Sequence, residues 1–185
     1  MKPKLKPQFL GSIILLCIIM SLCFQANAQF ETVYIGVNGL TCSQCSRTVE
    51  MRIRKLDFVA DVQMNLQNTE GKIILAKNKK ANMADLAQSV FDAGFSVRYL
   101  KADYNFDNQS FTSGPCFIFK GDEYVFNSPP AALSGKQTLK FLGKKFMPKS
   151  EYKKIQEKLE TQCSNTTGTI YHVELANTDA NPKAQ

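Results

Sequence analysis

One stretch, VYIGVNGLTCSQC at residues 33–45, determines how the rest of the chain is interpreted. Apolar side chains alternate along residues 33–37, which indicates a half-buried strand. Two thiols, Cys42 and Cys45, follow where a helical pattern starts. Thiolates are soft ligands that favour ions such as Cu(I), Zn(II), Cd(II) and Hg(II), and a helix N-terminus favours thiolate over thiol. The pair is therefore a candidate metal site, although its spacing also serves disulfide chemistry.

The residues that follow extend this start into a complete domain. Val49, Ile53 and Leu56 recur with helical spacing, and Asn82 and Gly94 are suited to cap and stop a second helix. Strands and helices are predicted over residues 33–37, 49–56, 59–66, 72–77, 84–93 and 95–99. This βαββαβ order predicts an α+β fold, a ferredoxin-like sandwich with two helices on one face of a four-stranded antiparallel sheet.

The order and separation of these segments resemble the heavy-metal-associated (HMA) domain. This small module occurs in copper chaperones, in metal-transporting P-type ATPases and in the periplasmic mercury-binding protein. The resemblance covers residues 31–101, and it is carried by GLTCSQC at residues 39–45 and by the Gly94-Phe95 corner. It implies a domain that binds a soft metal ion.

The resemblance also assigns roles to single residues. It implies that Cys42 and Cys45 are the metal ligands. Leu40 stands where the family has Met, a side chain that packs inward and binds no metal, so an apolar replacement is tolerated. Phe95 is expected near the metal loop, where it shields or tunes the site, and ordinary core packing is its alternative role.

The identity of the ion follows from the number of ligands. Two thiolates give a linear or bent complex, which suits Cu(I) first and Hg(II) second, whereas Zn(II) usually requires four ligands. An unfilled coordination shell lets a partner's thiolate enter and leave with the ion. The expected function is capture of a thiophilic ion, followed by its sequestration or its transfer to a metal transporter or another metal-binding protein.

Two other functions compete with metal binding. The first is thioredoxin-like thiol–disulfide exchange, which also places Cys-x-x-Cys at a helix N-terminus. Against it, no Trp precedes Cys42 and no later Pro clearly matches the required cis-Pro position. The second is an interaction module that makes little use of its cysteines. No Ser/His/Asp set, phosphate loop or paired-carboxylate motif is evident, so we expect no enzymatic activity.

The N-terminus predicts export. Residues 1–28 contain three lysines, an apolar run from Phe9 to Phe24 and the small-residue cleavage site Ala26-Asn27-Ala28, which together indicate a signal peptide. We expect a periplasmic protein with no stable membrane span after cleavage, and an uncleaved anchor is the alternative. Removing the three lysines lowers the formal net charge from +7 to +4, too little to indicate a nucleic-acid partner.

The C-terminal part carries weaker patterns. Polar residues 102–115 are predicted to be a linker, residues 116–176 a β-rich domain resembling an oligonucleotide/oligosaccharide-binding (OB) barrel, and residues 177–185 a loose tail. Within the domain we expect a hairpin, two further strands and one helix. Their predicted positions are 117–119 and 124–126 for the hairpin, 138–147 and 169–175 for the strands, and 150–159 for the helix.

The remaining cysteines and the single histidine complete the candidates. Once the signal peptide is removed, Cys116 and Cys163 remain beside the Cys42–Cys45 pair, and in an oxidising compartment they are expected to form a disulfide. A buried free thiol at Cys116 is the alternative. His172 is expected to be structural, because a lone His on a predicted strand seldom binds metal.

Overall fold

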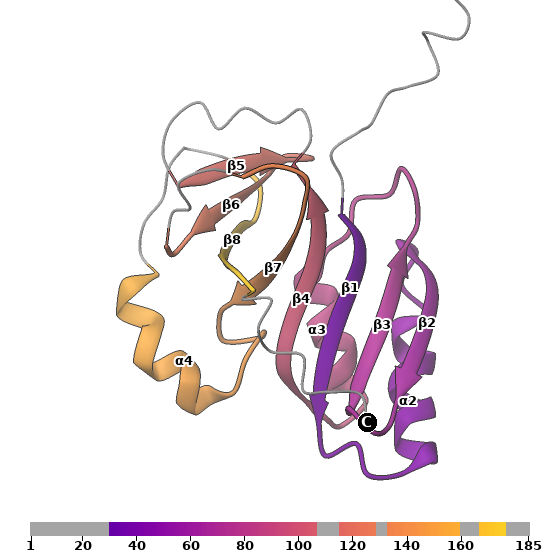
Figure 1. Ribbon diagram of the computed structural model, residues 1–185. Coiled ribbons are helices and arrows are strands. Elements are labelled where there is room, and N and C mark those ends of the chain that lie inside the picture. Colours follow the sequence, from indigo (N-terminus) through magenta and orange to yellow (C-terminus); the bar gives the residue numbers. More distant parts are fainter. Residues whose placement is uncertain (1–29, 107–114, 129–132, 160–166, 177–185) are drawn as a thin grey trace, which may run out of the picture.

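The computed structural model describes residues 30–106, 115–128, 133–159 and 167–176 (Figure 1). The predicted signal peptide, the C-terminal tail and Cys163 lie outside these residues. The strands are β1 (Phe30–Asn38), β2 (Val59–Asn65), β3 (Glu70–Leu75), β4 (Ser96–Asn105), β5 (Cys116–Phe119), β6 (Asp122–Phe126), β7 (Lys136–Leu142) and β8 (Ile170–Leu175). The helices are α2 (Ser43–Ile53), α3 (Met83–Asp92) and α4 (Lys149–Ile155), the last continued by the 3-10 turn η1 (Gln156–Lys158).

The N-terminal half has the predicted ferredoxin-like arrangement. Strands β2, β3, β1 and β4 lie in that order, and each neighbouring pair is antiparallel. Helices α2 and α3 lie on one face of these strands (Figure 1). The α+β class and the βαββαβ order are therefore confirmed for this half.

The central strand β1 explains why this half folds as it does. Val33, Ile35 and Val37 are fully buried, as the alternation in the sequence predicted. Gly36 pairs with Tyr99 on β4, and a Cβ added to Gly36 would lie only 2.6 Å from Tyr99 Cε1. The tyrosine ring therefore occupies the space that a side chain at position 36 would need.

The C-terminal strands do not form a separate barrel. They continue the same sheet, which within the described residues has eight strands in the order β2-β3-β1-β4-β7-β8-β6-β5. The new strands join through an antiparallel pair between β4 and β7, and β8 lies parallel to β6. The predicted β-rich character and the β5–β6 hairpin are found, but the OB-like barrel is not confirmed, because the described strands form an open order from β2 to β5.

The predicted boundary at residue 101 falls inside a strand. Strand β4 runs to Asn105, so residues 102–105 of the expected linker pair with β7. Phe106, directly after the strand, is 2% exposed, and its amide donates to the carbonyl of Gly135 at 2.9 Å. Residues 107–114 of the expected linker lie outside the described residues.

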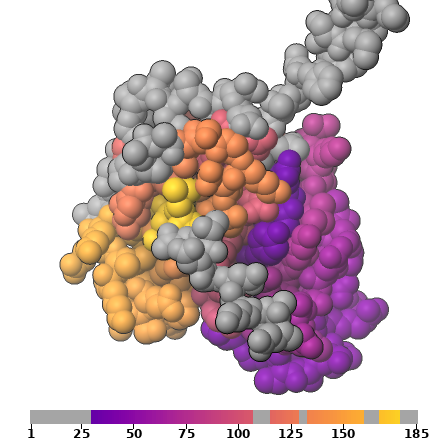
Figure 2. Space-filling view, viewed as in Figure 1, coloured from indigo at the N-terminus to yellow at the C-terminus, as the bar shows by residue number. Residues whose placement is uncertain are grey.

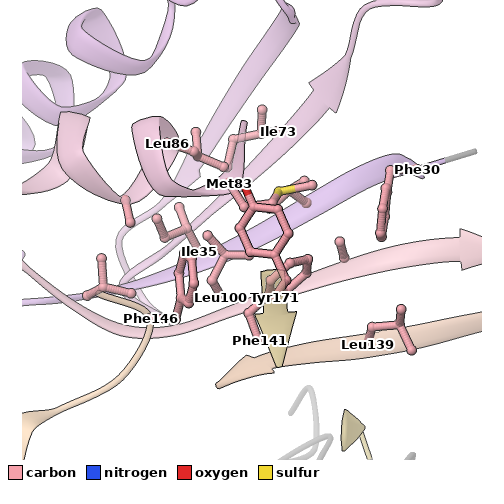
Figure 3. Packing of buried hydrophobic residues seen from close by; sticks show 14 of the residues in the cluster. Phe30, Ile35, Ile73, Met83, Leu86, Leu100, Leu139, Phe141, Phe146 and Tyr171 are labelled. Atoms are coloured by element: carbon pink, nitrogen blue, oxygen red, sulfur yellow. The ribbon is translucent and has the colours of Figure 1, made fainter. Parts of the chain in front are cut away.

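One aromatic core joins the two halves. Tyr104 contacts Phe30, Phe106 and Phe117 with ring centroids 4.6–4.9 Å apart. Tyr124 and Phe141 continue the cluster into the C-terminal strands, and Figure 3 shows Tyr171 beside Met83 of α3. In the space-filling view the indigo-to-magenta half and the orange-to-yellow half meet directly (Figure 2). Aromatic pairs of this kind contribute about 0.5–1.5 kcal/mol each beyond the area they bury.

Polar contacts also cross between the halves. Lys80 Nζ, before α3, donates to Asp122 Oδ1 on β6 at 2.7 Å, and the Asp122 side chain is only 3% exposed. Tyr171 Oη on β8 donates to Asn82 Oδ1 at 3.2 Å. Because a buried carboxylate is costly without partners, the Lys80 contact ties the loop before α3 to the C-terminal strands.

Candidate metal centre

The two cysteines lie at the junction between β1 and α2. Cys42 is the N-cap residue of α2, with an extended backbone, and its Sγ accepts a hydrogen bond from the Cys45 amide at 3.1 Å. Gly39 bends the chain out of β1 with φ of +81°, a left-handed conformation that glycine adopts without strain. The strand end and the helix start thus place both sulfurs at one end of the domain. The sequence predicted the helix start, but not that a sulfur atom would cap it.

Cys42 and Cys45 are joined by a disulfide, and their Cα atoms are 5.2 Å apart. Cys42 is exposed and Cys45 is half-buried. A disulfide offers no thiolate, so this form is the oxidised state of the site. Two electrons and two protons convert it to the dithiol, and loss of the protons then gives the ligand form.

The inner side of the loop is apolar. Leu40 is 2% exposed and belongs to the hydrophobic core, as predicted for this position. Phe95 is half-buried, and its Cδ1 lies 3.8 Å from the position of a Cβ built on Gly39. The ring therefore packs against the core and lies near the base of the loop, so its two predicted roles are compatible.

The surroundings of the cysteines are poor in additional ligands and in negative charge. The first turn of α2 has no acidic residue. Among the residues that the structure describes, no group of three or more Cys, His, Asp or Glu side chains is placed to hold a metal ion. Within the described residues, no third ligand is therefore grouped with Cys42 and Cys45, and no acidic residue in the first turn of α2 offsets the partial positive charge of the helix N-terminus.

The other candidate residues lie away from this loop. His172 is on β8, and burial lowers its pKa, which favours the neutral ring. Cys116 begins β5 and is disulfide-bonded, so the free-thiol alternative is wrong. Its predicted partner, Cys163, lies outside the described residues.

Comparisons with known proteins agree with this geometry. A family model described as "Heavy-metal-associated domain" matches residues 35–96. The mercuric transport protein periplasmic component of Pseudomonas fluorescens is 32% identical over 68 residues, which cover 37% of this chain and 74% of that protein. The chain belongs to the heavy-metal-associated domain family. The HMA domain begins within β1 and ends at the start of β4.

Further relatives place the HMA domain in two kinds of protein. Copper chaperone CopZ of Bacillus subtilis (strain 168) is 31% identical over 64 residues, 34% of this chain and 90% of the chaperone. Copper-transporting ATPase 1 of Rhizobium meliloti (strain 1021) is 34% identical over 67 residues, 36% of this chain but only 8% of the ATPase. The likeness to these three proteins is thus confined to little more than a third of this chain.

None of the helices in the described ranges is long and apolar enough to cross a bilayer.

Proposed function

We propose that this protein binds one soft metal ion through the thiolates of Cys42 and Cys45, and that it sequesters the ion or transfers it to a partner. One observation carries the proposal. Two cysteines with Cα atoms 5.2 Å apart lie at the N-terminus of α2, inside the matched HMA domain. Before the ion binds, an external dithiol reduces the disulfide by thiol–disulfide exchange and is itself oxidised to a disulfide.

The chemistry of the loop supports a carrier. Thiolates at a helix N-terminus are stabilised by its partial positive charge, and Cys42 is open to solvent. With two strong protein ligands, the ion keeps room for a third thiolate from a partner. Exchange then proceeds through a three-coordinate intermediate and needs no unfolding of the site.

Cu(I) is the proposed ion and Hg(II) the second candidate, because both accept two thiolates in a linear or bent geometry. Zn(II) is less suited, since it usually takes four ligands. The relatives named for copper and for mercury are consistent with either choice. The proposed partner is a metal transporter or another metal-binding protein, and the proposed location is the periplasm, reached through the signal peptide at residues 1–28.

The proposal is tested by titrating the reduced full-length mature protein with Cu(I) against a competing chelator, without oxygen. The matched variant is Cys42→Ser/Cys45→Ser, which should fold because Ser is a preferred N-cap residue. We expect one tightly held ion per chain, lost in the variant and in the oxidised wild type. Binding that is weak, or that the variant retains, contradicts the proposal.

The disulfide itself favours a second candidate, a thiol–disulfide oxidoreductase that uses the same pair. Such a protein would reduce insulin, and its Cys45→Ser variant, which keeps the exposed Cys42 thiol but cannot resolve the intermediate, would trap mixed disulfides with other proteins. We expect neither activity above the level of the double Ser variant. Insulin reduction together with weak Cu(I) binding would favour the oxidoreductase.

A further inference from the structure

A cavity lies where the HMA domain meets the C-terminal half. It has a volume of about 630 Å³, within the range of small-molecule sites. The ends of β1 and β4 contribute Asn38 and Ser96, whose side chains are 3.4 Å apart (Nδ2 to Oγ). The segment between β7 and α4 forms the facing side. The cavity therefore exists only because the C-terminal strands continue the sheet.

Part of the cavity lining is apolar. Val97 and Met147 are nearly buried, with exposed fractions of 2% and 5%. Phe91, at the end of α3, is 36% exposed and adds an aromatic surface. Ligand sites typically combine such a lining with a few polar groups that orient the ligand. The Asn38–Ser96 pair is suited to that second role.

The charge of the cavity is entirely positive. Lys144, Lys145 and Lys149 line it, and no Asp or Glu does so among the described residues. All three lysines are exposed, and none forms an ion pair with another residue in the described part of the chain. Four lysines elsewhere in that part do have carboxylate partners. The described lining of the cavity thus contains three cations and no anion.

We propose that this cavity binds a small organic anion with an apolar body, such as an aryl or alkyl carboxylate or sulfonate. The apolar part contacts Phe91, Val97 and Met147, and the acidic group is held by the lysines. Asn38 immediately precedes Gly39, where the chain turns toward the cysteine loop. Binding itself uses neither cysteine and does not rest on the proposed metal function.

The test uses two probes of the same shape and different charge. Anilinonaphthalene sulfonate is the anion, and phenylnaphthylamine is its neutral counterpart. Each is titrated into the full-length protein and followed by fluorescence. We expect one saturable site per chain for the anion, binding of the neutral probe that is about tenfold weaker or more, and weakening of anion binding by salt. Amide shifts near Val97 and Ser96 on addition of the anion should locate the site.

Charge-reversal variants distinguish binding in this cavity from nonspecific electrostatic attraction between the anion and the protein. Lys144→Glu/Lys145→Glu should weaken anion binding about tenfold or more, because two attractive charges become repulsive. Lys153→Glu/Lys154→Glu makes the same change in net charge at exposed positions outside the cavity, and should leave binding within about twofold. The Cys42→Ser/Cys45→Ser variant should bind as the wild type does.

Several results would overturn the proposal. One is equal affinity for the two probes, and another is anion binding to several sites without saturation. Unchanged anion affinity in Lys144→Glu/Lys145→Glu, or an equal loss of anion affinity in Lys153→Glu/Lys154→Glu, would also contradict it. Binding of an acidic hexapeptide where the sulfonate fails to bind would also overturn it, and would indicate a protein partner instead. Circular dichroism of each variant confirms that the fold is intact.

Discussion

The Tyr99 ring on β4 restricts which side chain can occupy position 36 on the neighbouring strand β1. The Tyr99 hydroxyl donates to Glu70 Oε2 at 2.5 Å, and the ring lies across Gly36. Burial raises the pKa of Tyr99, and the hydrogen bond to Glu70 raises it further, to about 12. The hydroxyl therefore stays protonated and acts as a donor. The ring therefore has a fixed position over β1.

Gly36→Ala tests this packing. The new Cβ would meet Tyr99 Cε1 at 2.6 Å, so the ring or the strand must move, and we expect a loss of about 1–3 kcal/mol in the free energy of unfolding. Urea denaturation measures the loss. In a Tyr99→Ala background the same substitution should cost much less, and an equal cost in both backgrounds would show that the ring is not the obstacle.

At the scale of single residues, the metal loop was the most predictable part of the chain. The motif placed Cys42 and Cys45 at a helix start, a feature that depends on residues close in sequence, and the resemblance to the HMA domain placed Leu40 in the core. The cavity lysines were not predictable. Lys144 and Lys145 appear in the sequence as an ordinary solvated pair, and only the pairing of β4 with β7 brings their segment to Asn38 and Ser96.

Among the elements, α3 has the clearest start signal. Asn82 Oδ1 accepts from the amides of Ala84 and Asp85 at 3.0 and 3.3 Å, as the sequence predicted for an N-cap. The same oxygen also accepts from Tyr171 Oη on β8. The cap of this helix is therefore shared between the HMA domain and the C-terminal strands.

Asn82→Ala should remove both contacts. We expect a loss of about 1–2 kcal/mol in the free energy of unfolding, from the missing cap and the lost hydrogen bond between Tyr171 and position 82. Asn82→Ser is the matched control, since Ser also caps helices, and it should cost less than Ala. Urea denaturation of the three proteins makes the comparison, and equal stability of the Ala variant and the wild type would contradict the role of the cap.

Strand β4 shows why the second half was harder to predict. Its last residues contain Asp103 and Asn105, which suggested a polar linker. In the structure Asp103 is 8% exposed, and Thr138 Oγ1 on β7 donates to its Oδ1 at 2.7 Å. When a buried polar side chain forms its hydrogen bond with a residue far away in the sequence, the sequence alone does not distinguish it from a polar residue in a loop. The short C-terminal elements were found by local pattern, but their order in the sheet depends on such distant pairs.

At the scale of the whole molecule, the shared sheet and core predict a single unfolding transition. Phe141 is fully buried and contacts Phe30, Tyr124 and Phe146. Phe141→Ala should lower the free energy of unfolding by about 3–5 kcal/mol. Hydrogen exchange should report the loss in both halves, including β2 and β3.

Ile118→Ala is the control for this experiment. It also truncates an apolar side chain in the C-terminal half, but Ile118 is 55% exposed, so the change should stay within about 0.5 kcal/mol. If Phe141→Ala weakens only the C-terminal strands and leaves exchange in β2 and β3 unchanged, then the halves unfold separately.

The antiparallel pairing of β4 with β7 also has a consequence for the chain during its synthesis. Asn105 pairs with Lys136 and Lys101 with Lys140, so the partner of β4 follows it by about 30 to 40 residues. Because the chain is synthesised from its N-terminus, β4 is complete before β7 exists. Its unpaired backbone groups form an open strand edge during that interval, and Tyr104 lacks its cover from later rings. We therefore expect the chain to be more prone to aggregate before β7 pairs with β4 than afterwards.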